Sequence, residues 1–238
     1  PSAFAAGGAA PAAPKPPDKA GDLLLNLVKH LAHPEAIIQG EGTWSCTVAS
    51  LEATAAQMAP ARYARMVIDL ATTGETKVPG GEKIQADHRG LRNEADGRDP
   101  IEDRLVSQVF GEKHDLLRAP PGQSLERAET THLLQVALRR GPVPAGVSFP
   151  SEDGKERLHH AVRVIGIQDA NGRSTLHPDK KIDGQKPGKP TTVIVADPQT
   201  GEERAVPIDR FLKDADFLTL PKEVLHPPNS MGLSAAAF

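Results

Sequence analysis

The sequence predicts an α+β fold in which a helical half precedes an antiparallel β half. Before residue 141, apolar residues recur at the three- and four-residue spacing of helices. After it, short β-branched runs are separated by turn residues. Helices followed by strands, rather than alternating with them, are typical of the α+β class. Hydrophobic residues make up 38% and charged residues 25% of the 238 positions, which suits a soluble globular chain.

The helical half is divided by capping residues and prolines. Asp22 is a candidate cap for the first helix, which His33-Pro34 ends, and Thr43 or Ser45 is the candidate cap for the second. Pro60 and Pro100 each stand where a proline can open a helix, and Gly141 suits the position just after a helix end. We expect helices over 22–32, 46–58, 61–72, 100–110 and 125–139.

The β half contains four runs with strand character and a short closing helix. The strands are expected over 142–149, 160–168, 191–198 and 203–208, and the helix over 208–215. Asp169-Ala170-Asn171-Gly172 indicates a hairpin turn. Residues 74–99 and 173–190 are polar and lack a clear period, so we expect two surface insertions.

The two chain ends differ in composition from the rest. Residues 1–20 are rich in Ala, Pro and Gly, which indicates a low-complexity linker from an upstream module or a ragged terminus. Residues 21–225 are expected to form one catalytic domain of two lobes, and 226–238 a flexible tail. The chain begins at Pro1 with no signal segment, so we expect it to be part of a longer protein.

Composition argues against several classes of function. A net charge of −3 does not favour nucleic-acid binding, and no apolar run approaches the ~20 residues that cross a bilayer. A single cysteine excludes a disulfide framework and a thiolate zinc site. The histidines at 30, 33, 159 and 160 lack a third ligand at metal-site spacing. We therefore expect no metal and no cofactor.

Cys46 is the first candidate for chemistry because it opens a predicted helix. The unpaired N–H groups and the dipole at a helix start favour a thiolate, which is the nucleophilic form of cysteine. The structural alternative is a small buried side chain, which is the commoner fate of a lone cysteine.

Three further residues could complete a site around Cys46. His160 begins an apolar strand and could exchange a proton with the thiol, while neighbouring His159 would face the other side. Asp197 ends a later strand and could orient the imidazole, although Asp-Pro is also ordinary turn chemistry. Gln39, just upstream of Cys46, could join the Cys46 N–H in an oxyanion hole.

The order Gln39, Cys46, His160, Asp197 resembles that of papain-like cysteine peptidases. The stretches QGEGTWSC, HHAVRVIGI and VIVADPQTGEERAVPIDRF carry the likeness over about residues 35–220. They are most similar to the bacterial branch, which includes bacteriocin-leader-processing peptidase domains and papain-like toxin or effector domains. The resemblance implies a helical lobe with the nucleophile helix, then an antiparallel β lobe, with the site between them. The chain departs from papain in lacking the C-G-[SA]-C-[WY] box.

The resemblance leaves three functions open. One is a peptidase that hydrolyses an amide bond of a protein or peptide through Cys46, His160 and Asp197. The second is a deamidase or transglutaminase toxin with the same triad, and the third is a catalytically dead binding module. Trp44 could line the substrate pocket. A toxin would be secreted or delivered to a target cell, with a cognate inhibitor or immunity protein as a partner.

Overall fold

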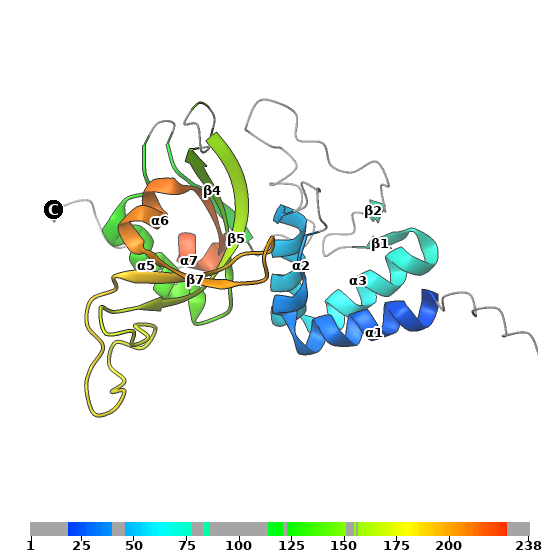
Figure 1. Ribbon diagram of the computed structural model, residues 1–238, viewed down its shortest axis with the longest axis horizontal. Coiled ribbons are helices and arrows are strands. Elements are labelled where there is room, and N and C mark those ends of the chain that lie inside the picture. Colours follow the sequence, from blue (N-terminus) through cyan, green and yellow to red (C-terminus); the bar gives the residue numbers. More distant parts are fainter. Residues whose placement is uncertain are drawn as a thin grey trace, which may run out of the picture.

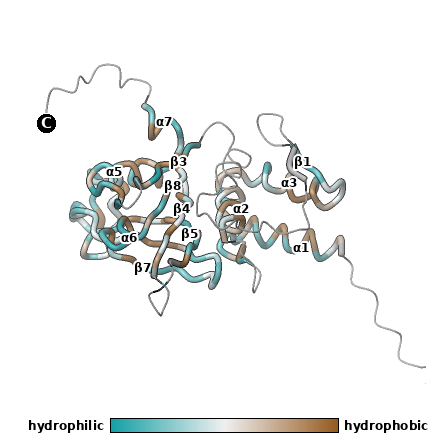
Figure 2. Tube along the Cα trace, turned by 90° about the horizontal axis from the view of Figure 1, so that it is seen from above, coloured by the Kyte–Doolittle hydropathy of each residue, from teal (hydrophilic) through white to brown (hydrophobic). Residues whose placement is uncertain are grey.

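The computed structural model describes residues 19–39, 46–77, 83–85, 114–120, 123–150, 155 and 157–227. Their elements form a helical lobe and a sheet lobe, and α2 is the helix that lies next to the sheet in both views (Figures 1 and 2). Each lobe has its own cluster of buried apolar residues. The predicted α+β class, with helices first and an antiparallel sheet second, is confirmed.

The helical lobe is built from three helices and one 3-10 turn among the described residues. They are α1 (Lys19–Ala32), η1 (Pro34–Ala36), α2 (Cys46–Met58) and α3 (Pro60–Thr73). Prolines begin η1 and α3, as their fixed φ and missing N–H allow in a first turn. Gly74 ends α3 with a φ of 74°, the left-handed conformation that favours glycine.

The core of the helical lobe contains few large side chains. Alanines of α2 supply Ala49, Ala53, Ala55 and Ala56 to it. Small side chains let helices approach one another closely, which explains how a chain with 3% aromatic residues packs this lobe. Leu27 of α1 and Tyr63 of α3 fill the remaining space.

The sheet lobe contains a six-stranded antiparallel sheet with the order β3-β8-β4-β5-β6-β7. The strands are β3 (His114–Arg118), β4 (Val143–Pro150), β5 (Arg157–Gln168), β6 (Thr192–Ala196), β7 (Glu203–Pro207) and β8 (Ala215–Pro221). Its helices are α5 (Arg127–Leu138), α6 (Ile208–Asp214) and α7 (Lys222–Leu225). Side chains of α5, α6 and α7 share one apolar cluster with the inner face of the sheet.

The insertion between β5 and β6 is anchored at its base by one buried carboxylate. Asp169 accepts hydrogen bonds from the backbone N–H groups of Asn171, Arg173 and Gly188, at 2.8, 3.0 and 2.7 Å. The predicted turn is confirmed, with Gly172 at a φ of 74°. The polar segment therefore projects from a sheet in which β5 and β6 pair directly.

The structure corrects two predicted helix ends. α1 begins at Lys19, so Asp22 lies within its first turn and is not the cap. Gly141 has no positive φ. A Cβ at that position would lie 2.9 Å from the Met58 side chain, so close packing rather than a left-handed cap accounts for this glycine.

Four strands were not predicted. β1 (Glu75–Lys77) and β2 (Lys83–Gln85) pair within the segment expected to be an irregular insertion. β3 and β8 pair with each other across about 100 residues of chain, and β8 also pairs with β4. The predicted helix 100–110, residues 1–18 of the predicted linker 1–20 and residues 228–238 of the predicted tail 226–238 lie outside the described residues. Residues 19 and 20 of that linker belong to α1.

Candidate active site

Cys46 is the first residue of α2, and α2 packs against β5. Its side chain is partly buried. Ser50 lies one turn further along the same helix and donates a hydrogen bond of 3.3 Å to the carbonyl of Ala161 in β5. This bond fixes the start of α2 against the strand that carries His160, because Ala161 is the next residue. Ser50 was not identified from the sequence, although its spacing of four residues places it on the Cys46 face.

His160 and Asp197 form the centre of the candidate site. The Nε2 atom of His160 lies 2.8 Å from Oδ1 of Asp197, and each side chain is only 13% exposed. β5 and β6 are paired neighbours, with Arg163 opposite Ala196, so the start of one strand meets the end of the other. The predicted meeting of this histidine and this aspartate across two strands is confirmed.

The second side of the His160 ring interacts with Cys46. Burial alone would raise the pKa of the thiol, but hydrogen bonding from His160 and from the Ala161 and Thr47 backbone lowers it below its ordinary value. Burial likewise opposes the charged imidazole, yet Asp197 and Cys46 together raise the pKa of His160 to about 9. With Nε2 engaged by the carboxylate, Nδ1 is the ring nitrogen left for the sulfur. The arrangement lowers the pKa of the thiol and raises that of the imidazole, and both changes favour the thiolate–imidazolium pair over the two neutral groups.

A turn after β6 holds the Asp197 carboxylate in place. Oδ1 of Asp197 also accepts the Gln199 N–H at 2.8 Å, and the Asp197 carbonyl accepts the N–H of Gly201, whose φ is 72°. Burial raises the pKa of Asp197, but its bonds to His160 and Gln199 outweigh burial and lower it. The Asp197 carboxylate therefore stabilises the turn and bonds to the His160 ring at the same time.

Gln39 is tied to the same turn through its backbone. Its N–H donates a 2.8 Å hydrogen bond to the carbonyl of Pro198, the residue after Asp197. Its side-chain oxygen Oε1 is buried and accepts no hydrogen bond from the described residues. The structure thus places Gln39 beside the Asp197 turn, but gives no contact between its amide and Cys46 among the described residues.

Comparisons with protein-family models, with curated proteins and with solved structures found no match.

His159 faces away from Cys46, as the alternation of a strand predicts. Its Nδ1 atom lies 2.7 Å from Oγ of Ser148 and 3.4 Å from Oδ2 of Asp216, and the Ser148 hydroxyl donates to Asp216. All the His159 contacts in this cluster converge on one ring nitrogen. A catalytic triad needs the base and the orienting acid on opposite nitrogens, so this cluster lacks that arrangement.

Other candidates from the sequence have structural roles or lie outside the description. The Nδ1 atom of His30 bonds to the Tyr63 hydroxyl at 3.2 Å, and His33 pairs with Glu35 at 3.0 Å. Glu52 of α2 is partly buried, and this burial raises its pKa. Trp44 lies outside the described residues.

The described residues include no cluster of three or more His, Cys, Asp or Glu side chains that could hold a metal ion. Within the same ranges, each helix is too short or too polar to span a bilayer.

Proposed function

We propose that this chain is a papain-like cysteine peptidase that hydrolyses an amide bond in a protein or peptide. The observation that carries the proposal is that His160 hydrogen-bonds to the Asp197 carboxylate and also lowers the pKa of the Cys46 thiol. Three residues distant in sequence meet in the relation that nucleophile, base and orienting acid require. Cys46 begins a helix, His160 is the fourth residue of a strand that begins earlier than the sequence predicted, and Asp197 follows a later strand. Their order along the chain is that of the superfamily.

The first half of the reaction uses the charge state of the pair. The Cys46 thiolate attacks the substrate carbonyl carbon, and a C–S bond forms as the carbonyl oxygen becomes an oxyanion. The imidazolium of His160 gives its proton to the leaving nitrogen as the C–N bond breaks. Asp197 keeps the ring oriented and stabilises its positive charge. The N–H of Cys46 and the amide of Gln39 are the proposed oxyanion donors.

The second half releases the acyl group. His160, now neutral, takes a proton from a water molecule that attacks the thioester carbon. The C–S bond then breaks, the thiolate leaves, and the acid product departs. No metal or organic cofactor takes part in either half.

Product mass on a target tests the reaction class. The chain and its Cys46→Ala variant are incubated with a mixture of peptides and unfolded proteins, and products are weighed by mass spectrometry. Peptidase activity predicts fragments that are absent with Cys46→Ala and present with His159→Ala, since His159 contacts Ser148 instead of the thiol. An intact target heavier by about one dalton would indicate glutamine deamidation by the same three residues. Cleavage that survives in Cys46→Ala would contradict the proposal.

A further inference from the structure

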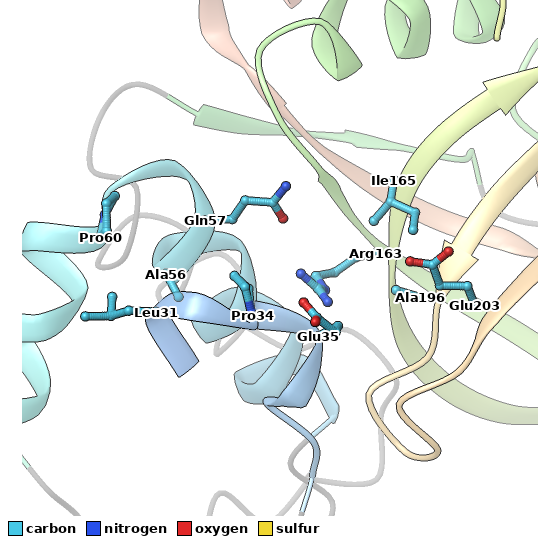
Figure 3. A pocket seen from close by; sticks show the side chains of 10 residues that line it. All are labelled: Leu31, Pro34, Glu35, Ala56, Gln57, Pro60, Arg163, Ile165, Ala196 and Glu203. Atoms are coloured by element: carbon cyan, nitrogen blue, oxygen red, sulfur yellow. The ribbon is translucent and has the colours of Figure 1, made fainter. Parts of the chain in front are cut away.

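A second feature between the two lobes is a cavity of about 490 Å³. Its walls come from both sides: Leu31, Glu35 and Gln57 from the helical lobe, and Arg163, Ile165 and Glu203 from the sheet lobe (Figure 3). This volume lies within the range of about 300–1,000 Å³ that small-molecule sites occupy. We call it the interlobe cavity.

The interlobe cavity adjoins the proposed active site but does not include its three residues, since Ala196, which lines the cavity, directly precedes Asp197. Gln57 and Cys46 lie near opposite ends of α2, eleven positions apart. At a rise of about 1.5 Å per residue the separation is roughly 16 Å. Cys46, His160 and Asp197 do not line the cavity. A ligand there would not occupy the thiol's position.

Arg163 is the side chain that marks the cavity as a binding site. The residue is charged but only 5% exposed, and it stands in β5 between Val162 and Val164, which belong to the apolar core of the sheet lobe. Figure 3 shows its side chain extending from β5 toward the helical side of the cavity. Among the described residues, its guanidinium group forms neither a hydrogen bond nor an ion pair. A guanidinium group has five N–H donors, and burial lowers the pKa of Arg163, so a ligand that accepts from these donors would offset the lost hydration.

Two carboxylates near Arg163 restrict the charge of a ligand. Glu35 and Glu203 attract the Arg163 charge from opposite lobes. Glu35 is partly engaged by His33, and both glutamates are exposed. A multiply charged anion would be repelled by the two carboxylates, whereas a ligand bearing one charge of each sign complements all three groups.

We propose that the interlobe cavity binds a free α-amino acid with an apolar side chain. The ligand's carboxylate would accept paired hydrogen bonds from Arg163, and its ammonium group would lie between Glu35 and Glu203. Its side chain would pack on Leu31 and Ile165. Because the walls belong to both lobes, the bound amino acid would hold the two lobes together.

Four probes separate the elements of this recognition. L-leucine carries both charges and an apolar side chain; N-acetyl-L-leucine lacks the positive charge, L-leucinamide lacks the negative one, and glycine lacks the side chain. Isothermal titration of the full chain should show one leucine per chain and binding about tenfold or more weaker for each analogue. No leucine binding at millimolar concentration, or equal binding of the analogues, would overturn the proposal.

Two variants locate the site and one serves as the control. Arg163→Gln should weaken leucine binding by about tenfold or more, because charged hydrogen bonds are lost. Gln57→Trp should fill the cavity with a large side chain while leaving Arg163 in place. If Arg163→Gln fails to fold, the loss of leucine binding in Gln57→Trp tests the proposal instead. Arg210→Gln, which changes an exposed side chain of α6, should leave binding unchanged. Leucine binding that persists in Gln57→Trp would overturn the proposal. So would an Arg163→Gln variant that is less stable but binds leucine as well as the wild-type chain, since Arg163 would then only stabilise the contact between the lobes.

Discussion

At the scale of single residues, the charge on His160 depends on its two neighbours. Burial favours the neutral ring, and only the hydrogen bonds and charges of Asp197 and Cys46 raise its pKa to about 9. Both partners act on the same ring. Removing either should therefore change how the other is ionised.

Asp197→Ala should lower the pKa of His160 from about 9 toward its ordinary value of 6.5 or below. The reason is that the variant loses the hydrogen bond and the negative charge that outweigh burial. An NMR titration of the ring resonances measures the change. Asp216→Ala is the control, since Asp216 contacts His159. A His160 titration unchanged by Asp197→Ala would show that Asp197 does not set the charge of the ring.

The sequence predicts a candidate residue best where its place at the end of a helix or strand is enough to suggest its role. Cys46 and Asp197 could be predicted because a helix start and a strand end are visible in the sequence. Arg163 and Ser50 could not, because their roles depend on which lobe packs against them. A charged residue within an apolar strand and a serine one turn from a cysteine were the signals available.

At the scale of elements, one hydrogen bond aligns α2 with β5. Ser50→Ala should leave the buried Ala161 carbonyl without this donor, reducing the free energy of unfolding by about 0.5–1.5 kcal/mol. It should also slow alkylation of Cys46, because the thiol would be held less closely to His160. Thr72→Ala is the matched control, as its hydroxyl bonds an exposed carbonyl within α3. Denaturant unfolding of both variants gives the difference, and an equal effect would contradict the alignment role.

Glycine at position 146 is required by the contact between β4 and β8. A Cβ there would lie 2.1 Å from the Phe217 ring, in a sheet whose bulge fixes the local register. Gly146→Ala should therefore reduce the free energy of unfolding by about 1–3 kcal/mol. Gly166→Ala is the control, since its Cβ would meet Ile194 at an ordinary 3.4 Å. Equal stability of the two variants, measured by thermal or denaturant unfolding, would show that Phe217 moves aside freely.

The elements that the sequence did not predict are those stabilised by distant pairing. β8 is buried along nearly its whole length and lies between β3 and β4, so its residues show no alternation. A short apolar run after a helix cannot be assigned from periodicity alone. β3 has only five residues, and its partner lies about 100 positions away. The other four strands of the sheet carried turn signals at their ends and were predicted.

At the scale of the whole molecule, the site lies where the two lobes meet. α2 belongs to one buried cluster while β5 belongs to the other, and Cys46 and His160 are on these two elements. The charges of Cys46 and His160 should therefore affect the stability of the whole chain.

The two pKa shifts affect stability with opposite signs. The raised pKa of His160 stabilises the fold below pH 6.5, and this contribution is lost as the pH rises through about 9. The lowered pKa of Cys46 contributes stability above its ordinary 9.0, which is lost as the pH falls through the lowered value. In the folded chain the thiolate–imidazolium pair binds one proton, and in the unfolded chain the neutral thiol and neutral imidazole also bind one. Once the thiol has ionised, the contributions of His160 and Cys46 to the pH dependence of stability therefore cancel.

Cys46→Ala should remove this offset. Its free energy of unfolding should fall with rising pH between 6.5 and the remaining raised pKa of His160, by up to about 1.4 kcal/mol per pH unit. The wild-type chain should show a shallower fall once its thiol has ionised. Denaturant unfolding across this range measures both slopes. Parallel slopes would contradict a charged pair in the folded state.

The most direct test of the central claim is the pH dependence of Cys46 alkylation. Iodoacetamide reacts with the thiolate, Cys46 is the single cysteine, and the modified chain can be quantified by mass. For the wild-type chain, the alkylation midpoint should lie below pH 9.0; in His160→Ala it should rise, because the hydrogen bond and charge of the imidazole are lost while burial of the thiol remains. His159→Ala should keep the wild-type midpoint. A wild-type midpoint at or above 9.0, or one that His160→Ala leaves unchanged, would contradict the proposed nucleophile and its base.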